Sequence, residues 1–422
     1  MAEKRSFFYT AETLIGRWLP NSVSVNVCLF VGANSHGQLG LNVISEQVNA
    51  PTKITRDFWS KTKQVACGGG HTLLLDDEGK LFACGWNVKK QLGLVDEAIY
   101  FERVWCLSGI NFTNISCGWD FSCGVTDEKY LFVWGSNSHG QLGLPKEHFS
   151  DAVKPVRLQV NACSVSMGLR HTAIINSKGE VWTTGCGKHG QLGLGPHILI
   201  SDRFQKVPLT SMVTHIVCGQ NHTLAWSSDE KALYVWGDNK HSQLLLASEK
   251  YKKVYKPQKI DIDVKKKVKR LLSGWTNALL WLEDGQLLAW GRNSYGQLAT
   301  NEPFEGKIIH IKLPGMFYYS SSSNLFRIVF SNCYKKLFLH FSEERQVKDV
   351  VLGSEHTVCL ATDNTLWAWG WNEHANTGTA SGDYVFTPSL ITFDQDLHSQ
   401  ITQIYAGSAH NFVVTEKESN EL

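Results

Sequence analysis

The chain is organised around the stretch Gly32-Ala33-Asn34-Ser35-His36-Gly37-Gln38-Leu39-Gly40, which returns almost unchanged as Gly135-Ser136-Asn137-Ser138-His139-Gly140-Gln141-Leu142-Gly143. Looser copies begin at Gly85, Gly185, Gly237, Gly291 and Gly370. The first six copies lie 53, 50, 50, 52 and 54 residues apart, and the last gap is 79 residues. Self-similarity at a period near 50 predicts an array of like supersecondary units.

A second signature runs in step with the first and consists of a glycine, two variable residues and, in most copies, a histidine. Its seven copies are Cys67-Gly68-Gly69-Gly70-His71, Cys117-Gly118-Trp119-Asp120-Phe121, Met167-Gly168-Leu169-Arg170-His171, Cys218-Gly219-Gln220-Asn221-His222, Ser273-Gly274-Trp275-Thr276-Asn277, Leu352-Gly353-Ser354-Glu355-His356 and Ala406-Gly407-Ser408-Ala409-His410. Between the two signatures, short β-prone runs flank a turn such as Asp76-Asp77-Glu78-Gly79, which is typical of a β-hairpin. The units therefore read as seven small antiparallel sheets.

The two ends of the repeat array complement each other. The segment Leu29-Phe30-Val31-Gly32 is the outer half of a hairpin, and the missing inner half occurs at 407–414. Pairing these halves would close a ring without an open sheet edge. We therefore predict an all-β, seven-bladed β-propeller over residues 28–416, preceded by a flexible tail at 1–27 and followed by a tail at 417–422.

The composition excludes several classes of function. The 422 residues are 43% hydrophobic and 19% charged, with a formal net charge of +2, so no global field favours nucleic acid or a membrane surface. The most apolar region, 325–341, is interrupted by Arg327, Lys335 and Lys336, which argues against membrane insertion. Eleven cysteines without a Cys-x-x-Cys pair, and no secretory signal, favour reduced thiols. We expect a monomer in the cytoplasm, with the nucleus as a second location.

Two regions depart from the repeat. Compared with the other units, about 25 additional residues lie at about 301–350, which predicts either a surface loop or a projecting element that contacts a partner. The run Lys265-Lys266-Lys267-Val268-Lys269-Arg270 predicts either a lysine-rich outer strand that protects a blade edge or a patch for nuclear import or an anionic surface.

Neither signature carries catalytic or cofactor chemistry. The Gly-x4-Gly spacing lacks the lysine and hydroxyl of a phosphate-binding loop, because Gln38 and Leu39 stand in their places. The repeated histidines occur once per unit without metal-ligand spacing, so we interpret them as core residues bonded to nearby backbone. No Ser/His/Asp arrangement, paired carboxylates or nucleophile elbow is present. We predict no catalytic residues, no cofactor and no metal site.

The candidate binding residues lie between the glycine and the histidine of the second signature. Because these two positions vary from unit to unit at equivalent places, they should form a ring around one mouth of the channel. Tryptophan and arginine are favoured anchors in protein interfaces. The alternative is that both tryptophans only pack between blades. The predicted partner-binding rim consists of Trp119, Asp120, Arg170, Asn221, Trp275, Thr276 and Glu355.

Both signatures resemble the chromosome-condensation-regulator repeat family, whose founding member is the nucleotide exchange factor for the small GTPase Ran. The resemblance covers 28–416 with seven copies in phase. The Gly118-Trp119-Asp120-Phe121 and Trp371-Asn372-Glu373-His374 stretches are most similar to a family member linked to the exocyst and to regulated secretion. The resemblance implies a guanine nucleotide exchange factor for a small GTPase, which acts without covalent chemistry by favouring the nucleotide-free GTPase.

The resemblance leaves the partner open. The Ran exchange factor uses an acid and an imidazole from these ring positions, and Arg170 and Asn277 stand at the corresponding places in this sequence. This departure argues against Ran itself, and the basic tail that holds chromatin is absent. The alternative to exchange is a non-enzymatic adaptor that binds an exocyst or trafficking component.

Overall fold

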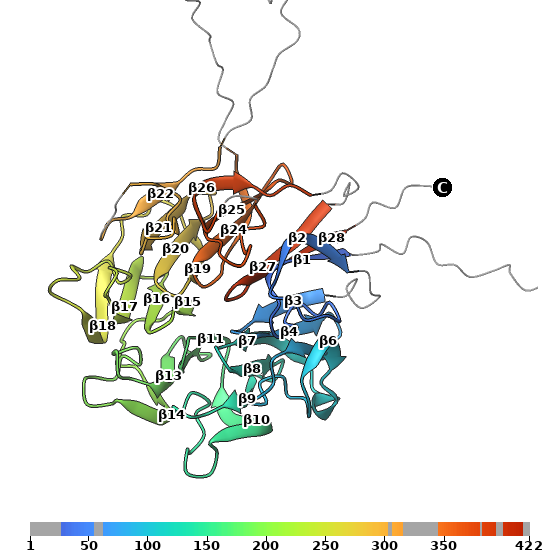
Figure 1. The fold of residues 1–422 in the computed structure, drawn as a ribbon. Coiled ribbons are helices and arrows are strands. Elements are labelled where there is room, and N and C mark those ends of the chain that lie inside the picture. The colour runs from blue at the N-terminus through green and yellow to red at the C-terminus, as the bar shows by residue number, and fades with distance from the viewer. Residues whose placement is uncertain are drawn as a thin grey trace, which may run out of the picture.

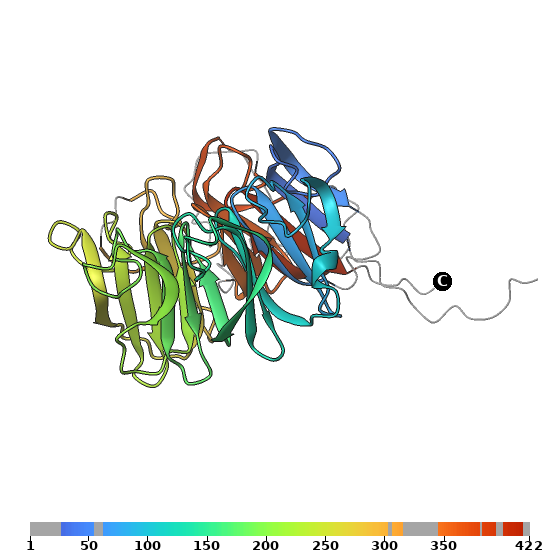
Figure 2. The same cartoon turned by 90° about the horizontal axis from the view of Figure 1, so that it is seen from below.

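Seven four-stranded antiparallel sheets surround a central channel in the computed structural model, which describes residues 27–54, 62–302, 306–314, 345–379, 382–393 and 400–416. The sheets stand side by side around the ring as blades (Figure 1). Seen from the edge, they form a disc (Figure 2). The fold is therefore the predicted all-β, seven-bladed propeller. Apart from Val27, the predicted tails at 1–27 and 417–422 lie outside the described residues.

The first three blades each contain four consecutive strands, which follow one another from the channel outward. Blade 1 contains β3 (Thr62–Cys67), β4 (His71–Asp76), β5 (Leu81–Gly85) and β6 (Ala98–Arg103), and the short 3-10 helix η2 (Trp105–Leu107) follows it. Blade 2 contains β7 (Phe112–Cys117), β8 (Phe121–Thr126), β9 (Tyr130–Ser136) and β10 (Asp151–Asn161). Blade 3 contains β11 (Ser164–Met167), β12 (His171–Ile175), β13 (Val181–Cys186) and β14 (Ile200–Lys206).

The next three blades follow the same order. Blade 4 contains β15 (His215–Cys218), β16 (His222–Ser227), β17 (Ala232–Asp238) and β18 (Lys253–Asp261). Blade 5 contains β19 (Val268–Ser273), β20 (Asn277–Leu282), β21 (Leu287–Gly291) and β22 (Ile309–Ile311). Blade 6 contains β23 (Val347–Leu352), β24 (His356–Ala361), β25 (Leu366–Trp371) and β26 (Tyr384–Leu390).

Blade 7 is shared between the two ends of the chain. Its strands from the channel outward are β27 (Gln400–Ala406), β28 (His410–Glu416), β1 (Val27–Ala33) and β2 (Gln47–Ile54). Strands β28 and β1 pair in antiparallel fashion, with Leu29 opposite Val413 and Phe30 opposite Phe412. The predicted closure of the ring is confirmed, and it removes the edge that an open array would expose.

The core lies between the blades. The second strand of each blade is covered on both faces by its neighbours, so every residue of β4, β8, β12, β16, β20 and β24 is buried. Outermost strands such as β18 expose many of their residues and are largely polar. This gradient explains why the inner runs are almost continuously apolar or small.

The glycine that opens each copy of the first signature permits a close backbone approach. Gly185, for example, has φ +112°, and a Cβ at this position would lie 2.5 Å from the carbonyl oxygen of Arg170. The other six copies have φ between +98° and +112° and a similar approach. Only glycine tolerates both conditions without strain.

The Gln-Leu pair of the first signature joins each blade to the next. The carbonyl oxygen of Gln191 accepts hydrogen bonds from Thr223 Oγ1 and from the indole Nε1 of Trp236, both at 2.9 Å. The adjacent Leu192 is buried in the same seam. Gln91, Gln243 and Gln297 likewise accept a bond from a buried tryptophan of the following blade. The Gln-Leu pair therefore connects neighbouring blades by hydrogen bonds and by packing.

The structure places the two regions that depart from the sequence repeat. The predicted insertion at 301–350 includes β22 and the start of β23, and most of its other residues lie outside the described ones. The lysine run does not form an outer strand, because β19 is the innermost strand of blade 5. That prediction was wrong. Instead, Arg270 pairs with Asp349 of blade 6 at 2.8 Å, and Lys269 Nζ lies 3.6 Å from the ring centre of Trp281.

Candidate protein-interaction face

The variable pairs of the second signature lie on the turns between the first and second strands of the blades. All seven turns surround one mouth of the channel, whose volume is about 120 Å³. Backbone hydrogen bonds join neighbouring turns, for example from Gly69 N to Trp119 O at 3.0 Å and from Gln220 N to Trp275 O at 3.1 Å. Most neighbouring turns on this face of the disc, the ring face, are thus bonded to one another.

Trp119 and Trp275 meet each other at this mouth. Their ring centres are 5.6 Å apart with an interplanar angle of 52°, although they come from blades 2 and 5. Trp119 remains 36% exposed. A Cβ on Gly69 would lie 2.8 Å from the Trp119 ring, so the absence of a side chain at this position in blade 1 leaves room for the indole. Both tryptophans line the channel and contact each other across it.

A buried carboxylate lies beside the tryptophans. Glu355 is only 5% exposed, and its two oxygens accept hydrogen bonds from Thr276 Oγ1 at 2.8 and 2.9 Å and from Gln297 Nε2 at 2.7 Å. Arg292 Nη1 lies 4.0 Å from the same carboxylate. Burial raises the pKa of Glu355, and the bonds from Gln297 and Thr276 and the charge of Arg292 oppose that rise.

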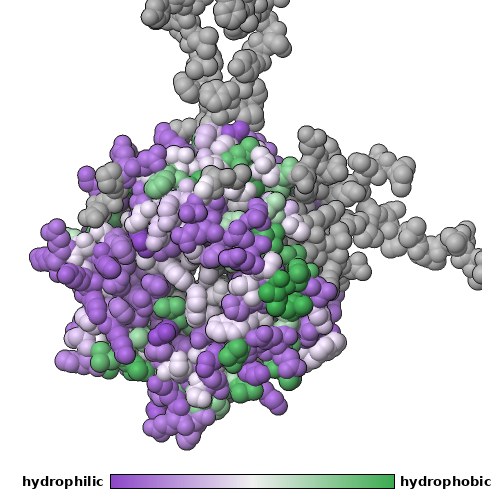
Figure 3. Space-filling model, in the orientation of Figure 1, coloured by the Kyte–Doolittle hydropathy of each residue, from purple (hydrophilic) through white to green (hydrophobic). Residues whose placement is uncertain are grey.

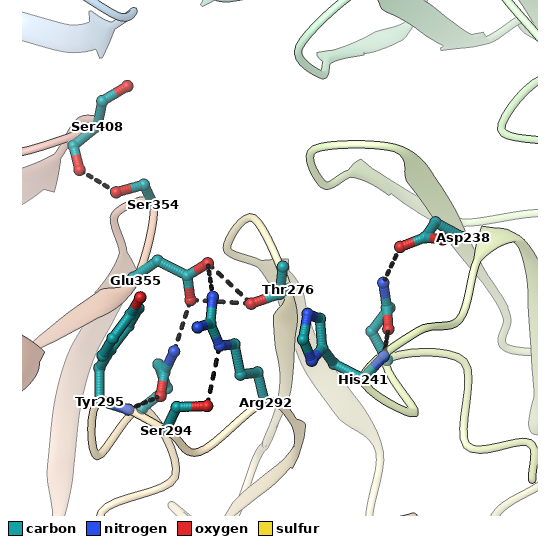
Figure 4. Close-up of polar contacts among 11 residues, drawn as sticks. Asp238, His241, Thr276, Arg292, Ser294, Tyr295, Ser354, Glu355 and Ser408 are labelled. Atoms are coloured by element: carbon teal, nitrogen blue, oxygen red, sulfur yellow. Dashed lines mark hydrogen bonds and ion pairs between the residues drawn. The ribbon is translucent and has the colours of Figure 1, made fainter. Parts of the chain in front are cut away.

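Arg292 is held in a fixed orientation at the outer side of this carboxylate. Its Nε donates to Ser294 Oγ at 3.0 Å, and its guanidinium carbon lies 4.2 Å from the ring centre of Tyr295. Figure 4 shows the arginine between Glu355 and Ser294, with Thr276 on the adjacent turn. Blades 5 and 6 therefore share one polar network that reaches from the ring to the neighbouring loop.

The opposite side of the ring carries a second polar group. Asp120 is half-buried, and burial raises the pKa of its carboxyl, whereas the bond to Ser136 and the charge of Arg170 lower it. Arg170 is exposed and donates from Nη1 to His139 Nε2 at 3.1 Å. Since a protonated imidazole cannot accept this bond, the contact requires neutral His139. The charge of Arg170 also contributes to lowering the pKa of His139, after burial.

The remaining rim positions are less exposed. Asn221 Oδ1 accepts a weak bond from Gln191 Nε2 at 3.4 Å. Asn277 occupies the histidine position of blade 5 and is only 2% exposed, so it packs inside the blade. The ring brings Trp119, Trp275, Thr276 and Glu355 together, whereas Asp120, Arg170 and Asn221 follow one another around the other side.

The propeller has relatives among known proteins. The family model described as the RCC1-like domain matches residues 27–413. The chain belongs to the RCC1-like domain family. It is 32% identical over 416 residues to the secretion-regulating guanine nucleotide exchange factor of Mus musculus, in an alignment that covers 94% of this chain and 85% of the mouse protein.

Solved structures agree with the RCC1-like fold. Human WBSCR16 superposes with a TM-score of 0.76 at 22% identity, over 93% of this chain and 99% of that one. Prp20p of Saccharomyces cerevisiae, described with its binding properties to Gsp1p and histones, also gives a TM-score of 0.76, at 20% identity over 94% and 93% of the two chains. At these identities, both establish the propeller architecture alone.

The repeated histidines of this RCC1-like propeller join blades. His71 Nε2 bonds to Ser122 Oγ at 2.8 Å, and His171 Nε2 bonds to Thr223 Oγ1 at 3.0 Å. We expected backbone partners for the ring nitrogens, and side chains of the following blade take that place at Nε2. Burial lowers the pKa of both histidines to about 3. Within the described ranges, no cluster of three or more His, Cys, Asp or Glu could hold a metal ion.

Sequence reasoning missed Arg292, Gln297 and His139. Arg292 directly follows the opening glycine of the first signature, a position that also varies among the blades and faces the ring. Ser136 occupies the same position in blade 2, where its side chain bonds to Asp120. Variation at the position after the opening glycine therefore also marks residues that contact the ring, and the sequence contained this signal.

The described residues that adjoin 315–344 lie on the face away from the ring, beside the turn at Asp284. Strand β23 runs toward the ring turn at Gly353, so its first residue, Val347, lies at the opposite end of the blade. Residues 301–302, at the start of the predicted insertion, lie instead beside Arg292 on the ring side. No helix in the described part of the chain is long and apolar enough to cross a membrane.

Proposed function

We propose that this RCC1-like propeller is a guanine nucleotide exchange factor that binds a small GTPase through its ring face. The observation that carries the proposal is the pair Trp119 and Trp275, an aromatic contact at the channel mouth with one ring 36% exposed. Tryptophan at the centre of a rigid surface is a frequent interface anchor. The likeness to a secretion-regulating exchange factor over 94% of the chain supports the class of partner.

Exchange by such a surface needs no covalent chemistry. A protein that binds the nucleotide-free GTPase more tightly than the loaded form must, by linkage, weaken the GTPase's affinity for nucleotide by the same factor. The ring is suited to this task because its turns are bonded to one another and do not have to be ordered on binding. Arg170 offers a positive charge on one side of the aromatic pair, and the buried Glu355 network holds the turns of blades 5 and 6 together on the other side.

The experiment is release of a fluorescent guanine nucleotide from a panel of small GTPases, followed by stopped flow. We expect micromolar propeller to accelerate release from one or a few members, and the effect to fall in Trp119→Ala. The matched control is Trp105→Ala, which removes an exposed tryptophan of η2 outside the ring. A propeller that accelerates release from no GTPase would refute exchange activity.

The same panel separates exchange from an adaptor role. Binding to a GTPase without faster release would leave a GTPase-binding adaptor, and recovery of an exocyst or trafficking component without any GTPase would favour the other sequence-based alternative. The contacts of the ring face do not favour that alternative. Affinity capture with nucleotide-free and loaded GTPases, followed by mass spectrometry, would distinguish these outcomes.

A further inference from the structure

A polar cavity of about 360 Å³ lies between the loops that follow β17 in blade 4 and β21 in blade 5. Its walls include Lys240 and Ser242 from the first loop and Arg292 and Ser294 from the second, and Phe386 of β26 also lines it. This volume falls within the range of small-ligand sites. Hydrophilic residues predominate over blade 4 on the face shown in Figure 3.

Ser242 is one of three residues, with Lys90 and Ala375, that replace the glycine of the repeat at this position while keeping a positive φ. It stands where four other blades have glycine, and its φ of +56° lies in the left-handed region that most side chains avoid. The residue is only 3% exposed, yet its Oγ makes no hydrogen bond to any described residue. A hydroxyl without a partner among the described residues, in the lining of a cavity, can donate a hydrogen bond to a ligand.

Two cations from different blades line the same cavity. Lys240 is exposed at the loop tip and forms no ion pair with the described residues. Arg292 is oriented by Ser294, Tyr295 and Glu355, and these contacts leave other guanidinium N–H donors unused. Among the described residues of the lining, Glu302 is the one carboxylate, so the cations outnumber the acid there. Figure 4 shows Arg292 and His241 on the two loops that enclose this space.

We propose that this cavity binds a phosphorylated serine or threonine side chain from a segment of a partner protein. A phosphate dianion offers three acceptor oxygens, which match an ammonium, a guanidinium and a hydroxyl better than the two oxygens of a carboxylate do. Phe386 provides an apolar contact for a residue next to the phosphate. The site is separate from the Trp119–Trp275 pair and does not depend on the proposed exchange activity.

The test is fluorescence anisotropy with peptides selected from a library of fixed phosphoserine or phosphothreonine and degenerate flanks, against their unphosphorylated forms. Lys240→Gln should weaken binding at least about 10-fold, since hydrogen bonds to charged groups contribute about 1.5–3 kcal/mol. Lys188→Gln is the matched control, because Lys188 occupies the same repeat position in blade 3 but does not line this cavity. Binding in that variant should stay within about 2-fold, because it keeps every donor of the cavity.

The decisive variant is Ser242→Gly, which restores the glycine of the repeat and removes the hydroxyl. It should fold at least as stably as the parent, because the left-handed backbone suits glycine. It should nevertheless weaken phosphopeptide binding about 3- to 10-fold, as expected for loss of one hydrogen bond. Inorganic phosphate should compete at millimolar concentration. Absence of any preference for phosphorylated peptides would overturn the proposal, and so would equal binding by all three variants and the parent. Unchanged nucleotide release in Ser242→Gly would show that phosphopeptide binding at this cavity is independent of the exchange activity proposed for the ring face.

Discussion

The indole rings of Trp119 and Trp275 contact each other across the mouth of the channel, with 5.6 Å between their ring centres. They belong to blades 2 and 5, which are not neighbours in the ring. Only a closed propeller with a narrow channel brings these two turns within reach of each other. The contact therefore depends on the closure of the whole ring, and it places the largest exposed aromatic surface of the rim at its centre.

Trp119→Ala should weaken partner binding strongly while changing stability little. Tryptophan anchors commonly contribute about 2 kcal/mol or more to binding, or roughly 30-fold in Kd. Because Trp119 is 36% exposed, its removal should lower the free energy of unfolding far less than removal of a buried tryptophan would. Isothermal titration calorimetry with the captured partner would measure the Kd, and thermal unfolding followed by calorimetry would measure the stability. Unchanged Kd would exclude the aromatic pair from the interface, and Trp105→Ala supplies the control for exposed tryptophan in general.

Glu355→Ala should destabilise the propeller by about 2–4 kcal/mol, because it leaves Thr276 and Gln297 without an acceptor and Arg292 without a nearby opposite charge. Urea unfolding at pH 7 would measure the loss. The exposed Glu128→Ala, in a turn of blade 2, should stay within about 0.5 kcal/mol. If Glu355→Ala unfolds at the same urea concentration as the parent, the polar network does not stabilise the ring.

The buried histidines should make the protein sensitive to acid. Burial lowers the pKa of His171 to about 3, so its contribution to stability is present above the unfolded value of 6.5 and is lost as the pH falls from there toward 3. Between pH 7 and pH 5 this loss is about 2 kcal/mol for one histidine. His171→Asn copies the asparagine that blade 5 carries at the same position, and it should reduce the pH 7 to pH 5 difference by that amount.

Urea unfolding at the two pH values would measure this difference. The exposed His36→Asn, on a loop tip of blade 7, serves as the control for replacing a histidine at the surface. An equal pH dependence in His171→Asn and the parent would show that the buried imidazole does not control acid unfolding.

Gly185→Ala should cost at least about 3 kcal/mol, whereas Gly109→Ala should cost about 1 kcal/mol. Both glycines have positive φ, +112° and +83° respectively, so both substitutions strain the backbone. A Cβ at position 185 would also lie 2.5 Å from Arg170 O, whereas nothing lies within 4 Å of one at position 109. Thermal unfolding of the two variants would isolate the cost of the steric clash. Equal losses would show that backbone conformation alone fixes the repeat glycine.

The repeat made the fold predictable. The spacing of Gly85, Gly135 and Gly185 specifies the blades, and the split hairpin specifies how they close, because each feature depends only on local pairing and period. The expectation of an outer strand for the lysine run was wrong, because the run directly precedes the second signature at Gly274, where each blade has its innermost strand. The sequence did not show that Arg270 of this strand pairs with Asp349 of the next blade.

The site was only partly predictable. Equivalent repeat positions placed Trp119 and Glu355 on one ring, but the sequence could not show which side chains reach one another across it. Arg292 contacts Glu355 from a different signature, and Ser242 lines its cavity only because two loops from neighbouring blades enclose the space. Such contacts depend on the distance between blades, which no single repeat encodes.

The split seventh blade has a consequence for biosynthesis. A ribosome makes β1 and β2 first, but β1 can pair with β28 only after the last blade strand has left the exit tunnel. During translation, the edge of β1 that later pairs with β28 therefore stays unpaired while the six other blades are made. Such an edge can recruit other nascent chains, so we expect newly made protein to need chaperone protection until the disc is complete.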